Sequence, residues 1–187
     1  MLPIWTIGHS NRSIGDFVAI LRSADIQLVA DVRTVPRSRA NPQFGEDRLP
    51  GELGPFGIAY ERFAELGGLR GRSRDVAPEV NAFWDNASFH NYADYALSAP
   101  FADGLDRLMQ VAAKRRTAVM CAEAVWWRCH RRIIADYLLA AGETVFHILG
   151  RGRIEPARMT TAAQPGPHGS LTYPAGDRAD AAPASGV

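Results

Sequence analysis

Two cysteines and a histidine lie close together in the C-terminal half of the chain. Cys121 ends the apolar run Thr117–Cys121, and Cys129 is followed directly by His130 and Arg131. The thiolate is the nucleophilic form of cysteine, and neighbouring basic groups lower the pKa of a thiol. With a histidine as acid or base, such a thiolate can attack an electrophile. Cys129 is therefore the first candidate nucleophile, with Cys121 as its partner or resolving thiol.

Three further polar residues stand at or just after predicted strands. His9 follows Pro3–Gly8, Asp31 ends Ile26–Asp31, and Glu123 comes shortly after Cys121. His9, like His130, is a candidate acid or base, and Glu123 is a candidate for orienting a histidine. Asp31 is a candidate catalytic carboxylate, although a carboxylate at a strand end equally often bonds nearby loop amides.

Arginine dominates the basic residues. All but Lys114 of the 21 basic residues are arginines, a count that a high-GC genome would largely explain. Their placement in clusters is more informative, because the planar guanidinium suits phosphate and carboxylate groups. Pro36 stiffens one of these arginine-bearing loops. The candidate substrate-binding residues are Ser10, Arg33, Arg37, Arg128 and Arg131.

Three chemistries remain open for these residues. In the first, a cysteine thiolate reacts with a small anionic substrate held by arginines, and no cofactor is needed. In the second, Cys121, Cys129, His130 and His9 bind a soft metal, although Cys-x7-Cys-His is not a usual ligand spacing. In the third, arginines and aromatic residues bind a nucleotide or nucleic acid without catalysis. The near-neutral charge of +1 favours a discrete anion over extended nucleic acid.

Strand and helix signals alternate along the chain, which predicts an α/β fold with a mainly parallel sheet. The predicted strands are Pro3–Gly8, Ile26–Asp31, Gly57–Tyr60, Thr117–Cys121 and a last one over Thr144–Ile148. One predicted helix begins after Ser13, its N-cap, and the others cover Tyr92–Leu97, Phe101–Ala113 and Trp127–Ala141. The segment Val32–Gly54 is predicted to be a long loop. In such folds ligands bind beyond the carboxyl ends of the strands, where the candidate residues cluster.

The predicted helix Trp127–Ala141 bears directly on the reactivity of Cys129. It places Cys129 in the first helical turn, where unpaired amides and the helix dipole stabilise a thiolate and attract an anion. His130 then begins the inward-facing stripe that continues with Ile134 and Leu138. We therefore expect His130 to point toward the edge of the sheet.

Composition predicts one globular domain. Apolar residues make up 47% and charged residues 22% of 187 residues, which suffices for a hydrophobic core. Residues 1–155 form the predicted domain, and residues 156–187, rich in Ala, Pro and Gly, the predicted flexible tail. No apolar run is long enough to span a membrane and no signal peptide is evident, so we expect a cytoplasmic protein with reduced cysteines. The oligomeric state is left open.

Eight motifs in order resemble the domain of unknown function 488 family. They are Thr6-Ile-Gly-His-Ser-Asn11, Asp31-Val-Arg33, Pro36-Arg-Ser38, Asn41-Pro-x-Phe44, Leu66-Gly-Gly68, Tyr92-x-x-Tyr95, Cys121-Ala-Glu123 and Cys129-His-Arg131. The resemblance covers roughly residues 4–148 and implies a single α/β domain in a cytoplasmic protein of bacterial type. The family has no established reaction, so the resemblance implies a fold and no activity. The expected architecture is a three-layer, Rossmann-like or flavodoxin-like domain.

Overall fold

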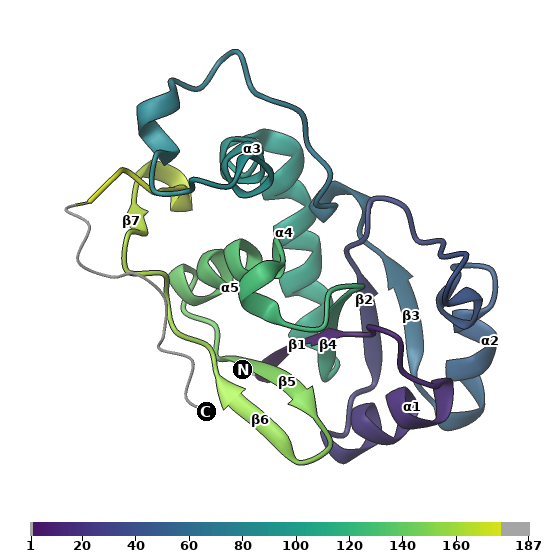
Figure 1. Cartoon of the computed structure of the whole chain (residues 1–187). Coiled ribbons are helices and arrows are strands. Elements are labelled where there is room, and N and C mark those ends of the chain that lie inside the picture. Colours follow the sequence, from purple (N-terminus) through teal and green to yellow (C-terminus); the bar gives the residue numbers. More distant parts are fainter. Residues whose placement is uncertain (1, 177–187) are drawn as a thin grey trace, which may run out of the picture.

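A six-stranded sheet forms the centre of the molecule (Figure 1). The computed structural model describes residues 2–176. The sheet has the order β3-β2-β4-β1-β5-β6, and all neighbours are parallel except the edge pair β5–β6. The strands are β1 (Ile4–Gly8), β2 (Leu28–Asp31), β3 (Ala59–Arg62), β4 (Thr117–Cys121), β5 (Val145–Gly150) and β6 (Arg153–Pro156). The predicted mainly parallel α/β sheet is confirmed.

The register of the three central strands brings their carboxyl ends together. Gly8 at the end of β1 pairs with Cys121 at the end of β4. Asp31 at the end of β2 pairs with Met120, one residue before Cys121. Strands far apart in the sequence therefore end side by side, and whatever follows them meets at one edge of the sheet.

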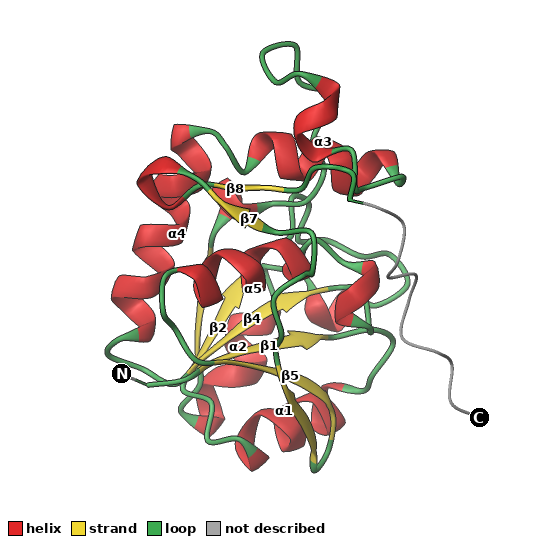
Figure 2. Ribbon diagram, turned by 90° about the vertical axis from the view of Figure 1, so that its left-hand side faces the viewer, coloured by secondary structure: helices red, strands yellow, loops and turns green. Residues whose placement is uncertain are grey.

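Helices cover both faces of the sheet, which gives three layers (Figure 2). The helices are α1 (Ile14–Ser23), α2 (Leu49–Leu53), α3 (Ala87–Tyr95), α4 (Ala99–Ala112) and α5 (Arg131–Ala140). Alternate residues of the strands point to opposite faces, as in any pleated sheet. One apolar core packs α1 and α2 against the sheet, and the other packs α3, α4 and α5 against its opposite face.

Local sequence signals explain where several elements begin. The Ser13 hydroxyl accepts a hydrogen bond from the Asp16 amide and so caps α1 as predicted. Short 3₁₀ turns interrupt the loops: η1 (Pro42–Phe44), η2 (Gly54–Phe56), η3 (Ala64–Leu66), η4 (Pro78–Asn81), η5 (Trp126–Arg128) and η6 (Pro167–Gly169). The predicted long loop after β2 thus contains η1 and the short helix α2.

Two sequence-based element assignments are wrong in detail. The segment predicted as one helix from Trp127 is the turn η5 followed by α5, which begins only at Arg131. Cys129 lies between them with extended backbone, at φ −129° and ψ 146°, so it is not in a helical turn. The strand β5 is not the last one, because the chain turns back antiparallel as β6.

The chain beyond Pro156 does not behave as a flexible tail over the residues that the structure describes. A small hairpin of β7 (Gln164–Pro165) and β8 (Leu171–Thr172) lies beside α3 and α5 (Figure 2). Leu171 and Tyr173 are fully buried in the core on that face. The predicted flexibility is therefore wrong for residues 156–176, and residues 177–187 lie outside the described part. The Ala, Pro and Gly content of the segment predicts flexibility, but two buried side chains are enough to anchor it.

Among the helices of residues 2–176, none combines the length and apolarity that a bilayer crossing requires.

Candidate functional site

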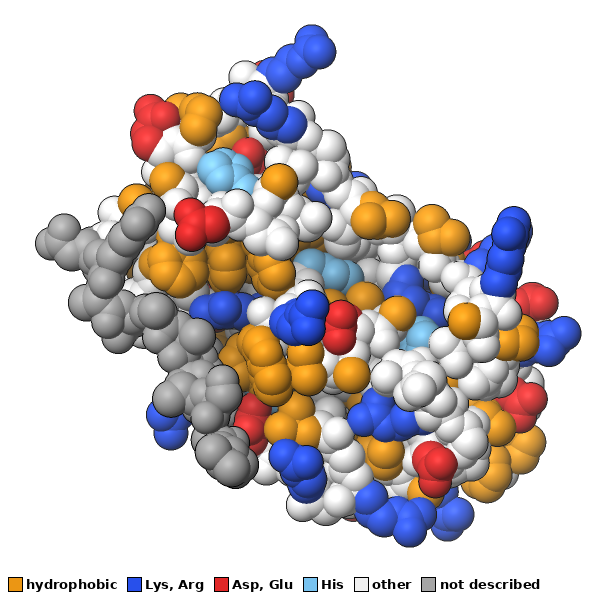
Figure 3. Space-filling model, viewed as in Figure 1, with side chains coloured by type: hydrophobic (Ala, Val, Ile, Leu, Met, Phe, Trp, Pro, Cys, Tyr) orange, Lys and Arg blue, Asp and Glu red, His pale blue; other side chains and the backbone are white. Residues whose placement is uncertain are grey.

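A cavity of about 690 Å³ opens at the carboxyl edge of the central strands. Its lining comes from the segments that follow β1, β2 and β4, together with the segments before α5 and at the start of α3. The sequence-predicted residues that line it are His9, Ser10, Arg33, Cys121, Glu123, Arg128, Cys129 and His130. Figure 3 shows histidine, basic and apolar side chains next to one another on this face. The tertiary fold thus brings together most of the residues selected from the sequence.

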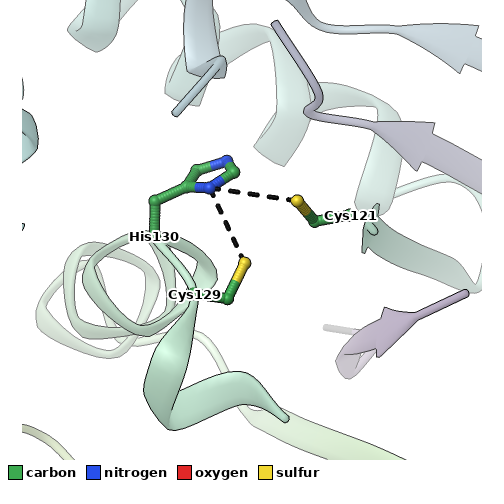
Figure 4. A group of neighbouring side chains, drawn as sticks. All are labelled: Cys121, Cys129 and His130. Carbon is green, nitrogen blue, oxygen red and sulfur yellow. Dashed lines mark hydrogen bonds between the residues drawn. The ribbon is translucent and has the colours of Figure 1, made fainter. Parts of the chain in front are cut away.

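Both sulfur atoms face one nitrogen of His130 (Figure 4). The Nδ1 atom lies 3.6 Å from Sγ of Cys129 and 4.0 Å from Sγ of Cys121. Cys121 is partly exposed, whereas only 4% of the Cys129 surface is exposed. Both cysteines are free, so the group holds two thiols and one imidazole around a common centre.

The hydrogen bond at the other ring nitrogen of His130 fixes the tautomer of this imidazole. Nε2 lies 3.0 Å from the carbonyl oxygen of Val32, which can only accept a hydrogen bond. Nε2 therefore carries a hydrogen, and in the neutral ring Nδ1 presents its lone pair to the sulfurs. Gly68 packs directly against the ring, since a Cβ there would lie 2.4 Å from Nδ1. The imidazole is held from both sides in one orientation.

A buried arginine lies against the sulfur of Cys129. Nε of Arg131 donates to Sγ at 3.3 Å, and Nη2 donates to the carbonyl oxygen of Glu123 at 2.5 Å. Arg131, predicted as a substrate-binding residue, is 1% exposed and does not line the cavity, so its charge lies against the Cys129 sulfur and outside the cavity wall. The Arg131 guanidinium thus lies against Cys129, although Cys129 is not in the first helical turn where the sequence analysis placed it.

The two thiols differ in acidity. Burial by itself opposes ionisation of Cys129, but a hydrogen bond from the Cys121 thiol and the charge of Arg131 lower the pKa of Cys129 well below its ordinary value. The hydrogen bond to Cys129, together with burial, raises the pKa of Cys121 well above its ordinary value. The contact with Arg131 therefore favours ionisation at Cys129 over ionisation at Cys121.

A second buried unit faces the cavity from β2. The Asp31 carboxylate accepts from Nε of Arg33 at 2.9 Å and from Nη2 at 2.5 Å, and it also accepts from the Tyr60 hydroxyl. Asp31 is fully buried and does not line the cavity, so it holds Arg33 in place. Nη2 also donates to the Phe44 carbonyl, and Nη1 lies 3.2 Å from Nε2 of His9. These contacts leave one N–H of Nη1 without an acceptor among the described residues.

His9 is occupied at both ring nitrogens. Nδ1 lies 2.7 Å from the carbonyl oxygen of Ser10, so it donates there, and Nε2 accepts from Arg33. Burial lowers the pKa of His9 to about 4. The ring stacks on Phe44 at 4.2 Å between centroids. His9 therefore positions the Arg33 guanidinium, and this geometry does not leave it free for the predicted acid–base role.

Close backbone packing shapes the loop that follows Cys121. A Cβ at Gly8 would lie 1.8 Å from the carbonyl oxygen of Glu123, so only glycine permits this approach. The amide of Ser10 donates to the Ala122 carbonyl, and Ser10 adopts φ 52°, a left-handed conformation that costs energy for residues other than glycine. The loops after β1 and β4 are thus tied together beside the cavity.

Two predicted site residues take other places. The Arg37 side chain is 80% exposed, lies 3.8 Å from the Glu46 carboxylate and does not line this cavity. Glu123 lines the cavity and its carboxylate accepts a 3.4 Å bond from the Val125 amide, but among residues 2–176 no hydrogen bond joins it to His9 or His130. The backbone of Val32 orients His130 in place of Glu123.

Some features of the site were not selected from the sequence as functional. The Val32 carbonyl escaped notice because a backbone acceptor carries no residue-type signal. Gly68 belongs to a glycine pair, which is a recognisable sign of close backbone approach. Val35 and Leu69 line the cavity as exposed apolar side chains.

The model of the family described as "Domain of unknown function DUF488" matches residues 13–138, which is more than half of the chain. The chain belongs to the DUF488 family. No curated protein and no solved structure shows a significant match to it. The match includes β2, β4, the two cysteines and most of α5, while β1 with His9 lies before its start. The sequence-based family assignment is confirmed, and the reaction has to be argued from the site.

Proposed function

We propose that this DUF488 protein is an enzyme that uses a cysteine thiolate on a small anionic substrate. The observation that carries the proposal is the placement of Nδ1 of His130 against both sulfurs while Nε2 is held by the Val32 carbonyl. This is the arrangement that a nucleophile and its acid–base partner require. The group lies in a cavity that is large enough for a small metabolite.

Each side chain then has a defined task. The Cys129 thiolate, stabilised by Arg131, forms the bond to the electrophilic atom of the substrate. As the bond to the leaving group breaks, the proton of the Cys121 thiol reaches that group through Nδ1 of His130. Arg33 lines the cavity, keeps one N–H of Nη1 without an acceptor among the described residues and binds the substrate anion, with Arg128 at the cavity wall as a second cation.

Substrate-independent alkylation tests the thiolate. Iodoacetamide should label Cys129 well below pH 8, with the fraction modified at each cysteine read by peptide mass spectrometry. The Cys121→Ser variant should keep this acidic profile at Cys129, and the Cys129→Ser variant should show labelling of Cys121 only at higher pH. An ordinary thiol profile at Cys129 contradicts the proposal.

Anion protection tests the binding part. Inorganic phosphate or sulfate should slow labelling of Cys129, and Arg33→Gln should reduce this protection. The matched control is Arg37→Gln, because Arg37 lies outside the cavity. A steeply salt-dependent nucleic-acid affinity that is unaffected by either cysteine variant would favour the binding module considered in the sequence analysis.

A further inference from the structure

We propose that Cys121, Cys129 and His130 together bind one divalent cation of the zinc type, with the fourth coordination position open to the cavity. The inference goes beyond the proposed function, because the sulfur lone pairs that attack a substrate are the ones that would bind the ion. The thiolate and the metal-bound group are alternative states of the same three side chains.

The ligand atoms already have the separations that a small tetrahedral ion needs. Zinc–sulfur bonds of about 2.3 Å and zinc–nitrogen bonds of about 2.0–2.1 Å place such ligands roughly 3.6 Å apart in a tetrahedron. The observed distances from Nδ1 to the two sulfurs are 3.6 and 4.0 Å. All three ligand atoms lie within 4.8 Å of one another. Only small shifts would close the group on an ion.

The surroundings of the ligands match those of a metal-binding histidine. A metal ligand histidine usually donates its second ring N–H to a carbonyl or carboxylate, which fixes its tautomer and orientation. His130 does this through Nε2 and the Val32 carbonyl. Two sulfurs and one imidazole are soft ligands that favour zinc over calcium or magnesium.

The open position follows from the number of ligands. Structural zinc sites have four protein ligands, whereas catalytic ones keep a position for water or substrate. The three side chains all line the cavity, and Arg33 lines the same space. An anion held by Arg33 would therefore have access to the ion.

The charge around the sulfurs is compatible with a divalent ion. Two thiolates balance the two charges of the ion, and Arg131, which contacts the sulfur of Cys129, lies outside the cavity lining. Metal ligands must be deprotonated, and binding releases their protons. Zinc binding should therefore weaken as the pH falls.

The experiment uses the full chain after removal of metal with EDTA and exchange into chelator-free buffer. Titration with Co²⁺ should produce a sulfur-to-metal charge-transfer absorption that saturates at one ion per chain, and Zn²⁺ should displace it. Calorimetry with Zn²⁺ gives the affinity and the number of ions bound per chain. In the same protein, Zn²⁺ should slow iodoacetamide labelling of both cysteines.

Variants test the three ligands. Cys121→Ser, Cys129→Ser and His130→Gln should each weaken Zn²⁺ binding by at least about tenfold, as loss of a ligand-shell group typically does. His168→Gln is the matched control, because His168 is exposed and lies outside the cavity. Circular dichroism establishes that each variant is folded, and the protection of thiols in the unmodified chain is a readout that needs no variant.

The outcomes separate the two proposals. A saturable sulfur-to-cobalt band supports the metal site, and labelling of Cys129 well below pH 8 in the metal-free chain supports the thiolate. Absence of a saturable sulfur-to-cobalt band, or zinc affinity that survives both cysteine variants, overturns the metal site and leaves the thiolate to the labelling experiment.

Discussion

Arg131 contacts the sulfur of Cys129 but does not line the cavity. Its guanidinium donates to the sulfur of Cys129 and to the Glu123 carbonyl, and almost none of its surface is exposed. A buried positive charge this close to a thiol favours the thiolate, because little water screens the interaction. The single residue therefore sets the charge of the site and also ties down the loop after β4.

Removal of this charge should make Cys129 less acidic. In Arg131→Gln, the pH midpoint of iodoacetamide labelling at Cys129 should rise by roughly 1–2 units, the usual effect of one close opposite charge. Arg115→Gln removes the same charge at an exposed position past α4 and should leave the midpoint in place. An equal profile in both variants would show that Arg131 does not stabilise the thiolate.

The segment between η3 and η4 packs against His130. Gly67 and Gly68 pass so close to other groups that neither position has room for a Cβ. At Gly68 the obstructing atoms belong to the His130 ring, and at Gly67 they belong to Thr34 and Ala64. This segment and the Val32 carbonyl hold the imidazole between them.

Gly68→Ala should displace the imidazole while the fold persists. We expect acidic labelling of Cys129 and protection by Zn²⁺ both to weaken, because Nδ1 no longer faces the sulfurs. Gly71→Ala is the matched control, since a Cβ at Gly71 meets no atom within 4 Å. Thermal unfolding compares the stability of the two variants. Unchanged chemistry in Gly68→Ala would mean that the orientation of His130 is not needed.

The turn η5, which leads to Cys129, is held by contacts with the edge strands β5 and β6. Trp126 stacks on His147 of β5 at 4.2 Å between ring centroids and donates through Nε1 to the Glu155 carboxylate of β6 at 2.6 Å. Burial lowers the pKa of His147 to about 3, so the ring stays neutral under the indole. The edge strands therefore help to place a residue of the site.

The C-terminal segment closes the molecule through a buried carboxylate. Asp136 of α5 accepts from the Thr160 amide at 2.8 Å and from the Tyr173 hydroxyl at 3.1 Å. Burial raises the pKa of Asp136 to about 6, although these hydrogen bonds act in the opposite direction. The whole fold thus carries an acid that gives up its proton only near neutrality.

This acid should make stability fall as pH rises. The folded state holds the Asp136 proton up to about pH 6, whereas the unfolded chain releases it near pH 4. The free energy of unfolding should therefore decrease between these values, by roughly 3 kcal/mol for two pKa units. The asparagine in Asp136→Asn cannot ionise. The free energy of unfolding of this variant, relative to that of the unmodified chain, should therefore rise by this amount between pH 4 and pH 7.

Urea unfolding at several pH values measures this difference. His9 and His147 have lowered pKa values and give the opposite slope, but they contribute equally to both proteins and cancel in the difference. Asp103→Asn changes an exposed carboxylate on α4 and should give a curve parallel to that of the unmodified chain. Parallel curves for Asp136→Asn as well would contradict the raised pKa.

The amino-acid sequence by itself determined the elements and the residue types of the site. Apolar runs such as Thr117–Cys121 predict buried strands, and Ser13 with Asp16 predicts the start of α1, because these signals act over a few residues. The cysteines and His130 were selected for their chemistry and their position after a strand. Such local information cannot tell a substrate-binding arginine from one that is buried under a sulfur.

Only the tertiary structure decided how the selected side chains are used. The parallel register places Gly8, Asp31 and Cys121 at one edge, and packing from distant segments then turns each side chain toward or away from the cavity. Arg33 and Arg37 stand four positions apart, yet one is locked by Asp31 and the other extends into solvent. Burial against distant segments, which no short stretch of sequence encodes, likewise anchors Tyr173 in a segment whose composition predicts flexibility.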